Sequence, residues 1–108
     1  MSNTIENLYS VVKNRQTNPQ EGSYTCYLFE KGLDKILKKV GEECSETIIA
    51  AKNGNNSDTV YEIADLMYHL MVLMVQQGID IREVLSELDD RSAKIGNLKK
   101  MRQTDKAT

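Results

Sequence analysis

Four carboxylates in two short motifs are the side chains best suited to chemistry in this sequence. Glu43 and Glu46 are three residues apart, and so are Glu62 and Asp65. Side chains at this spacing share one face of an α-helix, so two such helices side by side would bring four negative charges together. Because like charges repel, this arrangement calls for a cation. Oxygen ligands favour a hard divalent ion, Mg²⁺, with Mn²⁺ as a substitute.

Such a site is suited to attack on a phosphoanhydride. Mg²⁺ usually binds a few carboxylates together with phosphate oxygens of a substrate. The ion would neutralise phosphate charge, and a water deprotonated by the metal or by a spare carboxylate would be the nucleophile. The sequence has no Ser-His-Asp set and no glycine-rich phosphate loop that would suggest another reaction.

The alternative is that the acids form an ordinary solvated helix face. Lysines at one-turn spacing, such as Lys39 before Glu43, account for the first motif in this way. They do not account for the second, because Glu62 and Asp65 interrupt an apolar surface and have no Lys or Arg within one turn. His69 continues the same polar stripe, and we expect it to support the ligands or contact the substrate.

Hydrophobic periodicity predicts helices for the segments that carry these residues. The first helix starts at Asn3 or Thr4 and ends in the polar run before Pro19, and a fourth starts at a capping box, Asp80 to Glu83. Residues 24–31 form one or two helical turns, with a short strand as the alternative. The long helices that carry the acids span 33–52 and 57–77.

These two long helices differ in pattern. In helix 33–52 the apolar residues form one arc and Glu43 lies at its margin, while Gly41 suggests a close backbone approach. Helix 57–77, which Ser57, Asp58 or Thr59 would cap, is apolar almost all the way round. We therefore expect it at the centre of a bundle or in an oligomer interface.

Length, charge and cysteine content constrain the domain organisation, the partners and the location of the protein. The 108 residues suit one domain, with 1–96 as the folded part and 97–108 as a basic, flexible tail. A net charge of -2 gives no field to recruit nucleic acid or an anionic membrane. The start of the chain has no signal sequence and the two cysteines have no Cys-x-x-Cys spacing, so we expect reduced thiols in a cytoplasmic protein.

The two acidic pairs resemble the Glu-x-x-Glu and Glu-x-x-Asp signature of the all-α nucleoside triphosphate pyrophosphatases, the MazG-like superfamily. The longer runs 33–54 and 61–70 closely resemble its phosphoribosyl-ATP pyrophosphatase family. The resemblance implies an oligomeric all-α bundle of four to five helices that hydrolyses phosphoribosyl-ATP to phosphoribosyl-AMP and pyrophosphate in histidine biosynthesis. A cyclohydrolase that acts on the product would then be a separate partner.

The same resemblance assigns roles to single residues. It makes Glu43, Glu46, Glu62 and Asp65 the metal ligands and catalytic residues. Four further residues match the surroundings of the signature and would contact substrate: Lys39, Lys52, Asn53 and His69.

Two other interpretations remain open on the sequence. One is a house-cleaning pyrophosphatase acting on free nucleoside triphosphates. The other is a non-catalytic helical module that dimerises through its methionine-rich helix.

Overall fold

The fold is all-helical in the part of the chain that the structure describes, as predicted. It is a computed structural model that describes residues 3–94, 96 and 99–107. Within these residues no strand occurs and no helix is long and apolar enough to cross a membrane. The described residues form six helices: α1 (Thr4–Thr17), α2 (Tyr24–Lys31), α3 (Leu33–Lys52), α4 (Asn56–Gln77), α5 (Ile81–Ser92) and α6 (Gln103–Ala107).

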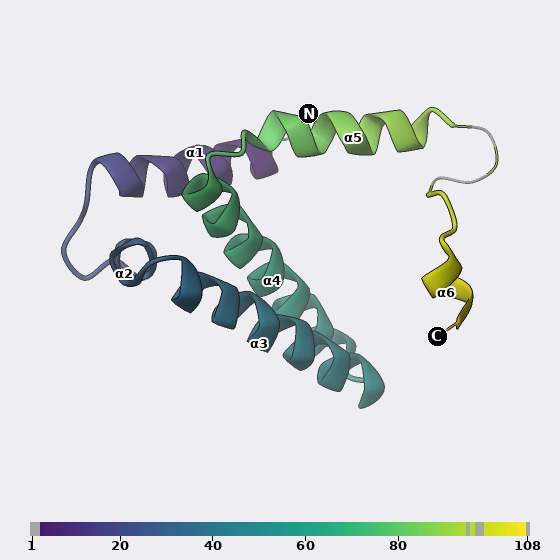
Figure 1. Cartoon of the computed structure of the whole chain (residues 1–108). Coiled ribbons are helices and arrows are strands. Elements are labelled where there is room, and N and C mark those ends of the chain that lie inside the picture. The colour runs from purple at the N-terminus through teal and green to yellow at the C-terminus, as the bar shows by residue number, and fades with distance from the viewer. Residues whose placement is uncertain (1–2, 95, 97–98, 108) are drawn as a thin grey trace.

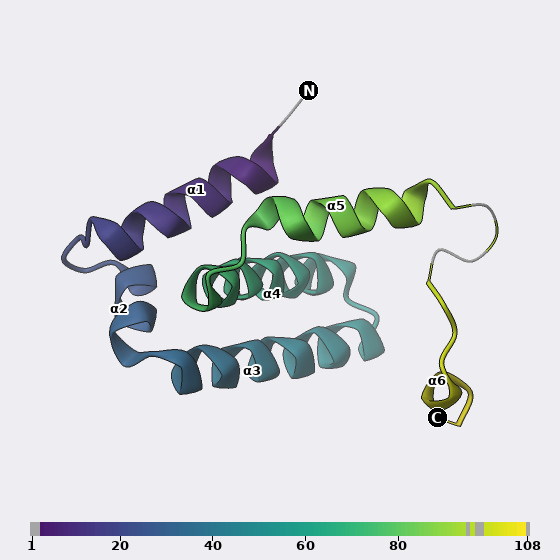
Figure 2. The same cartoon turned by 45° about the horizontal axis from the view of Figure 1, so that its top comes forward.

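An antiparallel pair formed by α3 and α4 is the centre of the molecule. The two long helices lie side by side in both views (Figures 1 and 2), joined by a turn at residues 53–55. Helix α2 crosses the start of α3, α1 runs over the end of α4 that is remote from the turn, and α5 begins at that same end. The predicted bundle of four to five helices thus corresponds to α1–α5, and α6 is a single short helix in the tail.

Local signals set most helix ends. The Ser23 hydroxyl accepts a hydrogen bond from Cys26 N, so 24–31 is a helix and not a strand. Asp80 and Glu83 form the predicted capping box of α5. The predicted start of α4, Ser57, is one residue late, because the helix begins at Asn56. Its cap is Asn55, whose side chain accepts from Asp58 N, because an Asn before the first turn caps as well as Ser or Asp.

The apolar core lies where α1, α2 and α5 meet the end of the pair that is remote from the turn. Its largest fully buried side chains include Val12, Leu28, Ile36 and Val72. The Tyr9 hydroxyl donates to Ile79 O at 2.6 Å and so joins α1 to the loop after α4. The start of α3 and the end of α4 are thereby fixed, and the acidic motifs lie further along the pair.

The long helices leave apolar residues uncovered. Leu37 and Ile48 belong to the predicted apolar arc of α3, yet they are 46% and 68% exposed. The close approach expected at Gly41 is also wrong, since a Cβ there would meet nothing within 4 Å. The helix is amphipathic as predicted, but half of the residues in its apolar arc are exposed within the described chain.

Both cysteines, Cys26 and Cys44, are free, as predicted.

Candidate functional site

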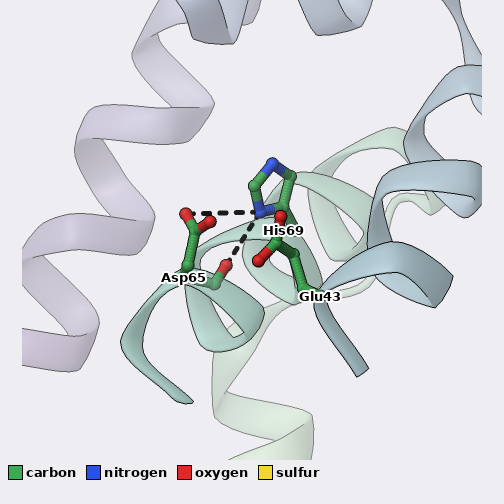
Figure 3. Close-up of side chains that lie close together, drawn as sticks. All are labelled: Glu43, Asp65 and His69. Atoms are coloured by element: carbon green, nitrogen blue, oxygen red, sulfur yellow. Dashed lines mark hydrogen bonds and ion pairs between the residues drawn. The ribbon is translucent and has the colours of Figure 1, made fainter. Parts of the chain in front are cut away.

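The two acidic motifs converge between α3 and α4. Glu43, Glu46 and Glu62 each offer an oxygen within 4.8 Å of the others, and a second group of the same compactness joins Glu43 to Asp65 and His69. Glu43 belongs to both groups. Figure 3 shows the second one, with Glu43 on α3 facing Asp65 and His69 on α4. The structure therefore brings all four predicted acids around one point.

Glu43 is more deeply buried than its place in the apolar arc predicted. Its residue is only 2% exposed, although the pattern placed it at the margin of the buried face. One carboxylate oxygen each of Glu43 and Glu62, Oε2 in both cases, is buried without a hydrogen-bond partner. Buried carboxylate oxygens without donors are costly to the fold. A bound cation would supply the missing partner.

The electrostatics of the cluster are unfavourable without such a cation. Burial, followed by the close carboxylates of Asp65 and Glu62, raises the pKa of Glu43 to about 8. Contact with Glu46, followed by burial, raises the pKa of Glu62. The shift at Glu43 means that this carboxyl favours its protonated form near neutral pH when no cation is bound, and the shift at Glu62 has the same direction. A divalent ion would reverse the preference.

Lys39 places a positive charge beside the cluster. Its Nζ lies 3.7 Å from Glu43 Oε1 and 3.2 Å from Glu42 Oε2. The hydrogen bond that Lys39 donates to Glu42 is the main reason that the pKa of Lys39 is raised. Lys39 therefore pairs most closely with the exposed neighbour of the site. Its pairing with Glu43, which was predicted, is longer.

His69 holds α4 in place and does not offer a lone pair to the cluster. It is 2% exposed, and its Nδ1 lies 2.8 Å from Asp65 O. Because a carbonyl only accepts, Nδ1 carries the hydrogen and donates, which leaves Nε2 as the acceptor. The Tyr24 hydroxyl, 2.9 Å from Nε2, donates to it. His69 thus fixes the turn that presents Asp65.

Tyr24 is a site residue that the sequence did not reveal. It opens the short helix α2 and reaches His69 across 45 positions of sequence. Nothing in its local pattern indicates this contact, since the chain around it reads only as a capped helix. A second link follows directly: the hydroxyls of Thr25 and Tyr68 lie 2.5 Å apart. The start of α2 is therefore fixed against α4 beside the acids.

Lys52 and Asn53 lie at the end of α3, outside this cluster. Both are exposed, and Lys52 is six residues beyond Glu46, about 9 Å along the helix axis at 1.5 Å per residue. Asn53 is the C-terminal cap residue of α3. Within the described residues neither contacts an acid of the site.

Comparison with known proteins gives one family. A model of the phosphoribosyl-ATP pyrophosphohydrolase family matches residues 5–92. A Clostridium botulinum (strain Hall) protein named phosphoribosyl-ATP pyrophosphatase is 53% identical over 103 residues, which cover 95% of this chain and 94% of the relative. A protein of the same name from Limosilactobacillus fermentum is 55% identical over 95 residues, or 88% of this chain and 90% of the relative.

A longer protein contains the same region. The histidine biosynthesis bifunctional protein HisIE of Caldanaerobacter subterraneus is 54% identical over 90 residues, which cover 83% of this chain and 44% of that protein. The region matched by the family model includes the four clustered acids, His69 and Tyr24.

Proposed function

This chain belongs to the phosphoribosyl-ATP pyrophosphohydrolase family, and we propose that it hydrolyses phosphoribosyl-ATP to phosphoribosyl-AMP and pyrophosphate, a step of histidine biosynthesis. The observation that carries the proposal is the convergence of four carboxylates from α3 and α4 around a point with two buried oxygens that no donor satisfies. A phosphoanhydride can be cleaved at such a point only if its negative charge is neutralised.

The donor set fits Mg²⁺, with Mn²⁺ as a substitute. All four proposed ligands, Glu43, Glu46, Glu62 and Asp65, offer carboxylate oxygens, which hard cations prefer. The two oxygens without donors support the fit, because a cation would supply the missing partner. When bound, the ion supplies charge neutralisation for the phosphates and acidifies a water.

The residues of the chain supply orientation and proton transfer. The hydrogen bond from His69 Nδ1 to the backbone carbonyl oxygen of Asp65 fixes the helical turn that carries the Asp65 carboxylate. A carboxylate that is not engaged as a ligand would accept the proton of the attacking water. Lys39, beside Glu43, is in reach of a phosphate bound at the acids.

The predicted substrate contacts differ in the support they have. Lys39 contacts Glu43 and is in reach of a bound phosphate. Both ring nitrogens of His69 are engaged by Asp65 O and the Tyr24 hydroxyl, so His69 would support Asp65 without contacting substrate itself. Lys52 and Asn53 would contact substrate only if it extends along α3 toward the 53–55 turn.

The uncovered apolar surface supports a homodimer. Leu37 and Ile48 on α3 are joined by exposed Val60, Ile63 and Met67 on α4. Next to them an apolar groove of about 160 Å³ lies between α4 and α5, lined by Met67, Leu70, Met74, Val84, Leu85 and Leu88 among others. Uncovered apolar residues on two central helices are typical of an association surface. A second copy is the proposed partner.

We also propose a cytoplasmic location and a separate partner enzyme. Two free thiols are consistent with a reducing, cytoplasmic location. The product would pass to a separate cyclohydrolase.

A substrate panel tests the proposed reaction. Wild-type protein with Mg²⁺ should release pyrophosphate from phosphoribosyl-ATP and leave ATP, GTP and deoxynucleoside triphosphates largely intact. Faster hydrolysis of the free triphosphates would instead favour the house-cleaning pyrophosphatase. Inactivity on every substrate, with folding verified by circular dichroism, would favour the non-catalytic module.

A further inference from the structure

We propose that the exposed rings of Tyr24 and Tyr27, with the cavity beside them, bind the purine base of the nucleotide substrate. The inference rests on the proposed function and deepens it, because it assigns a base-recognition subsite next to the acids. Neither tyrosine was expected from the sequence to contact a ligand.

The first observation is a cavity where the 19–22 linker meets α2. Its volume is about 610 Å³, and its lining includes Pro19, Ser23, Tyr24, Tyr27 and Glu30. This volume lies in the range of roughly 300 to 1,000 Å³ typical of small-molecule pockets.

The second observation is a pair of aromatic rings with free surface. Tyr24 and Tyr27 are one turn apart on α2, their ring centroids are 6.2 Å apart and their planes differ by 25°. They remain 45% and 40% exposed. Every nucleobase has a flat face that stacks on such rings. The pair is therefore a platform suited to a base, and it faces the cavity that both rings line.

The third observation connects this platform to the acids. The hydroxyl of Tyr24 lies 2.9 Å from His69, which itself contacts Asp65, while its ring lies beside Tyr27. A nucleotide whose base stacks on this pair therefore has its phosphates directed along Tyr24 toward the cluster. The cleaved bond and the base would occupy adjoining parts of one site.

Charge around the platform also suits a nucleotide. The ammonium groups of Lys31 and Lys35 lie 5.8 and 5.9 Å from the Tyr27 ring centroid. They offset the negative charge of the carboxylates beside the platform and so lower the repulsion that an approaching anionic nucleotide would meet. The carboxylates of Glu21 and Glu30 line the cavity and can accept hydrogen bonds from a purine amino group. These features favour an aminopurine nucleotide over an apolar ligand.

Kinetics of matched variants test the subsite. Tyr27 is exposed and contacts no acid of the cluster, so Tyr27→Leu removes a ring and leaves the chemistry in place. We expect its KM for phosphoribosyl-ATP to rise about 10-fold, in line with the loss of one stacking contact, while kcat changes less than about 2-fold. The control Tyr27→Phe keeps the ring and should match wild type. An unchanged KM in Tyr27→Leu would overturn the inference.

Direct binding gives a readout that does not depend on activity. Titration of wild-type protein with AMP in the absence of metal should shift the ring proton resonances of Tyr24 and Tyr27 in NMR spectra, and CMP should shift them less. Shifts confined to other residues, or none at millimolar AMP, would overturn the subsite. If wild type fails to cleave phosphoribosyl-ATP but AMP shifts these rings, the proposed reaction fails and the subsite stands.

Discussion

Glu43 is the residue on which the site depends most. It belongs to both groups of clustered side chains, it is buried, and its second oxygen has no donor. Burial of an unpaired carboxylate destabilises the folded state unless the group is protonated or a cation is present. In the metal-free protein, the free energy of unfolding therefore depends on pH through Glu43.

The sign of that dependence follows from the raised pKa. Glu43 has a pKa of about 8 in the folded state, above its ordinary value of 4.5. Between these values the folded protein holds a proton that the unfolded chain has lost, so the free energy of unfolding falls as pH rises through this window. Glu43→Gln removes the titration and should flatten the fall, by up to a few kcal/mol.

Thermal unfolding at pH 5 and pH 9 in EDTA measures this effect. Wild type should lose more stability than Glu43→Gln between the two pH values. Exposed Glu46→Gln is the control and should follow wild type more closely. Identical pH dependence in wild type and Glu43→Gln would show that Glu43 is not a buried, strained acid.

Metal affinity is the second prediction at the residue scale. Glu62 offers a buried oxygen without a donor, whereas its counterpart Glu42 is engaged with Lys39 and lies outside the cluster. Glu62→Gln should weaken Mn²⁺ binding by about 10-fold or more, and Glu42→Gln should leave it unchanged. Electron paramagnetic resonance of free Mn²⁺ gives both constants. Equal affinities in the two variants would contradict the assignment of ligands.

The acids of the site could be predicted from the sequence, whereas their burial and their contacts with other helices could not. Spacing alone indicated that Glu43, Glu46, Glu62 and Asp65 share helix faces, and the structure brings them together. The depth of Glu43 depends on how α3 rotates against α4, which no local pattern encodes. The contact between Tyr24 and His69 joins residues 45 positions apart, so it was not predictable from either neighbourhood.

At the scale of elements, the helices follow from periodicity and capping. The predicted span 33–52 coincides with α3, and Ser23 and Asp80 cap the helices that follow them. The error at the start of α4 arose because the run 55–59 offers several cap residues in succession, Asn, Asn, Ser, Asp and Thr. Propensity alone does not choose between them.

Capping variants test the corrected start of α4. The side chain of Asn55 accepts from Asp58 N at 3.0 Å. Asn55→Ala should therefore lower the free energy of unfolding by about 1 kcal/mol, the usual effect of losing a cap. Ser57→Ala, within the first turn, should cost less than about 0.5 kcal/mol. Urea denaturation followed by circular dichroism compares them, and a larger loss in Ser57→Ala would restore the original prediction.

At the scale of the whole molecule, the single chain leaves its two central helices partly uncovered. The sequence predicted an apolar surface nearly all round α4, but it could not show which part α1 and α5 cover. In the structure Met71, Val72 and Val75 are buried in the core that residues of α1, α2, α3 and α5 share, while Ile63 and Met67 stay exposed. The uncovered part is the surface for which we propose a second copy.

Sedimentation equilibrium tests this association. Wild type should have twice the 12.3 kDa mass of one chain. Met67→Lys places a charge in the apolar surface and should shift the protein toward monomer, because a buried unpaired charge is strongly unfavourable. Gln77→Lys, at another exposed position at the end of α4, should leave the mass unchanged. A wild-type monomer at micromolar concentration would contradict the proposed dimer.

The most direct test of the central claim is pyrophosphate release from phosphoribosyl-ATP by three proteins: wild type, Asp65→Asn and Glu42→Gln. The account predicts Mg²⁺-dependent release by wild type and Glu42→Gln, and a loss of at least about 100-fold in kcat for Asp65→Asn, comparable to losing one electrostatic contact to the transition state. Equal activity of Asp65→Asn and wild type, or release that persists in EDTA, would contradict it.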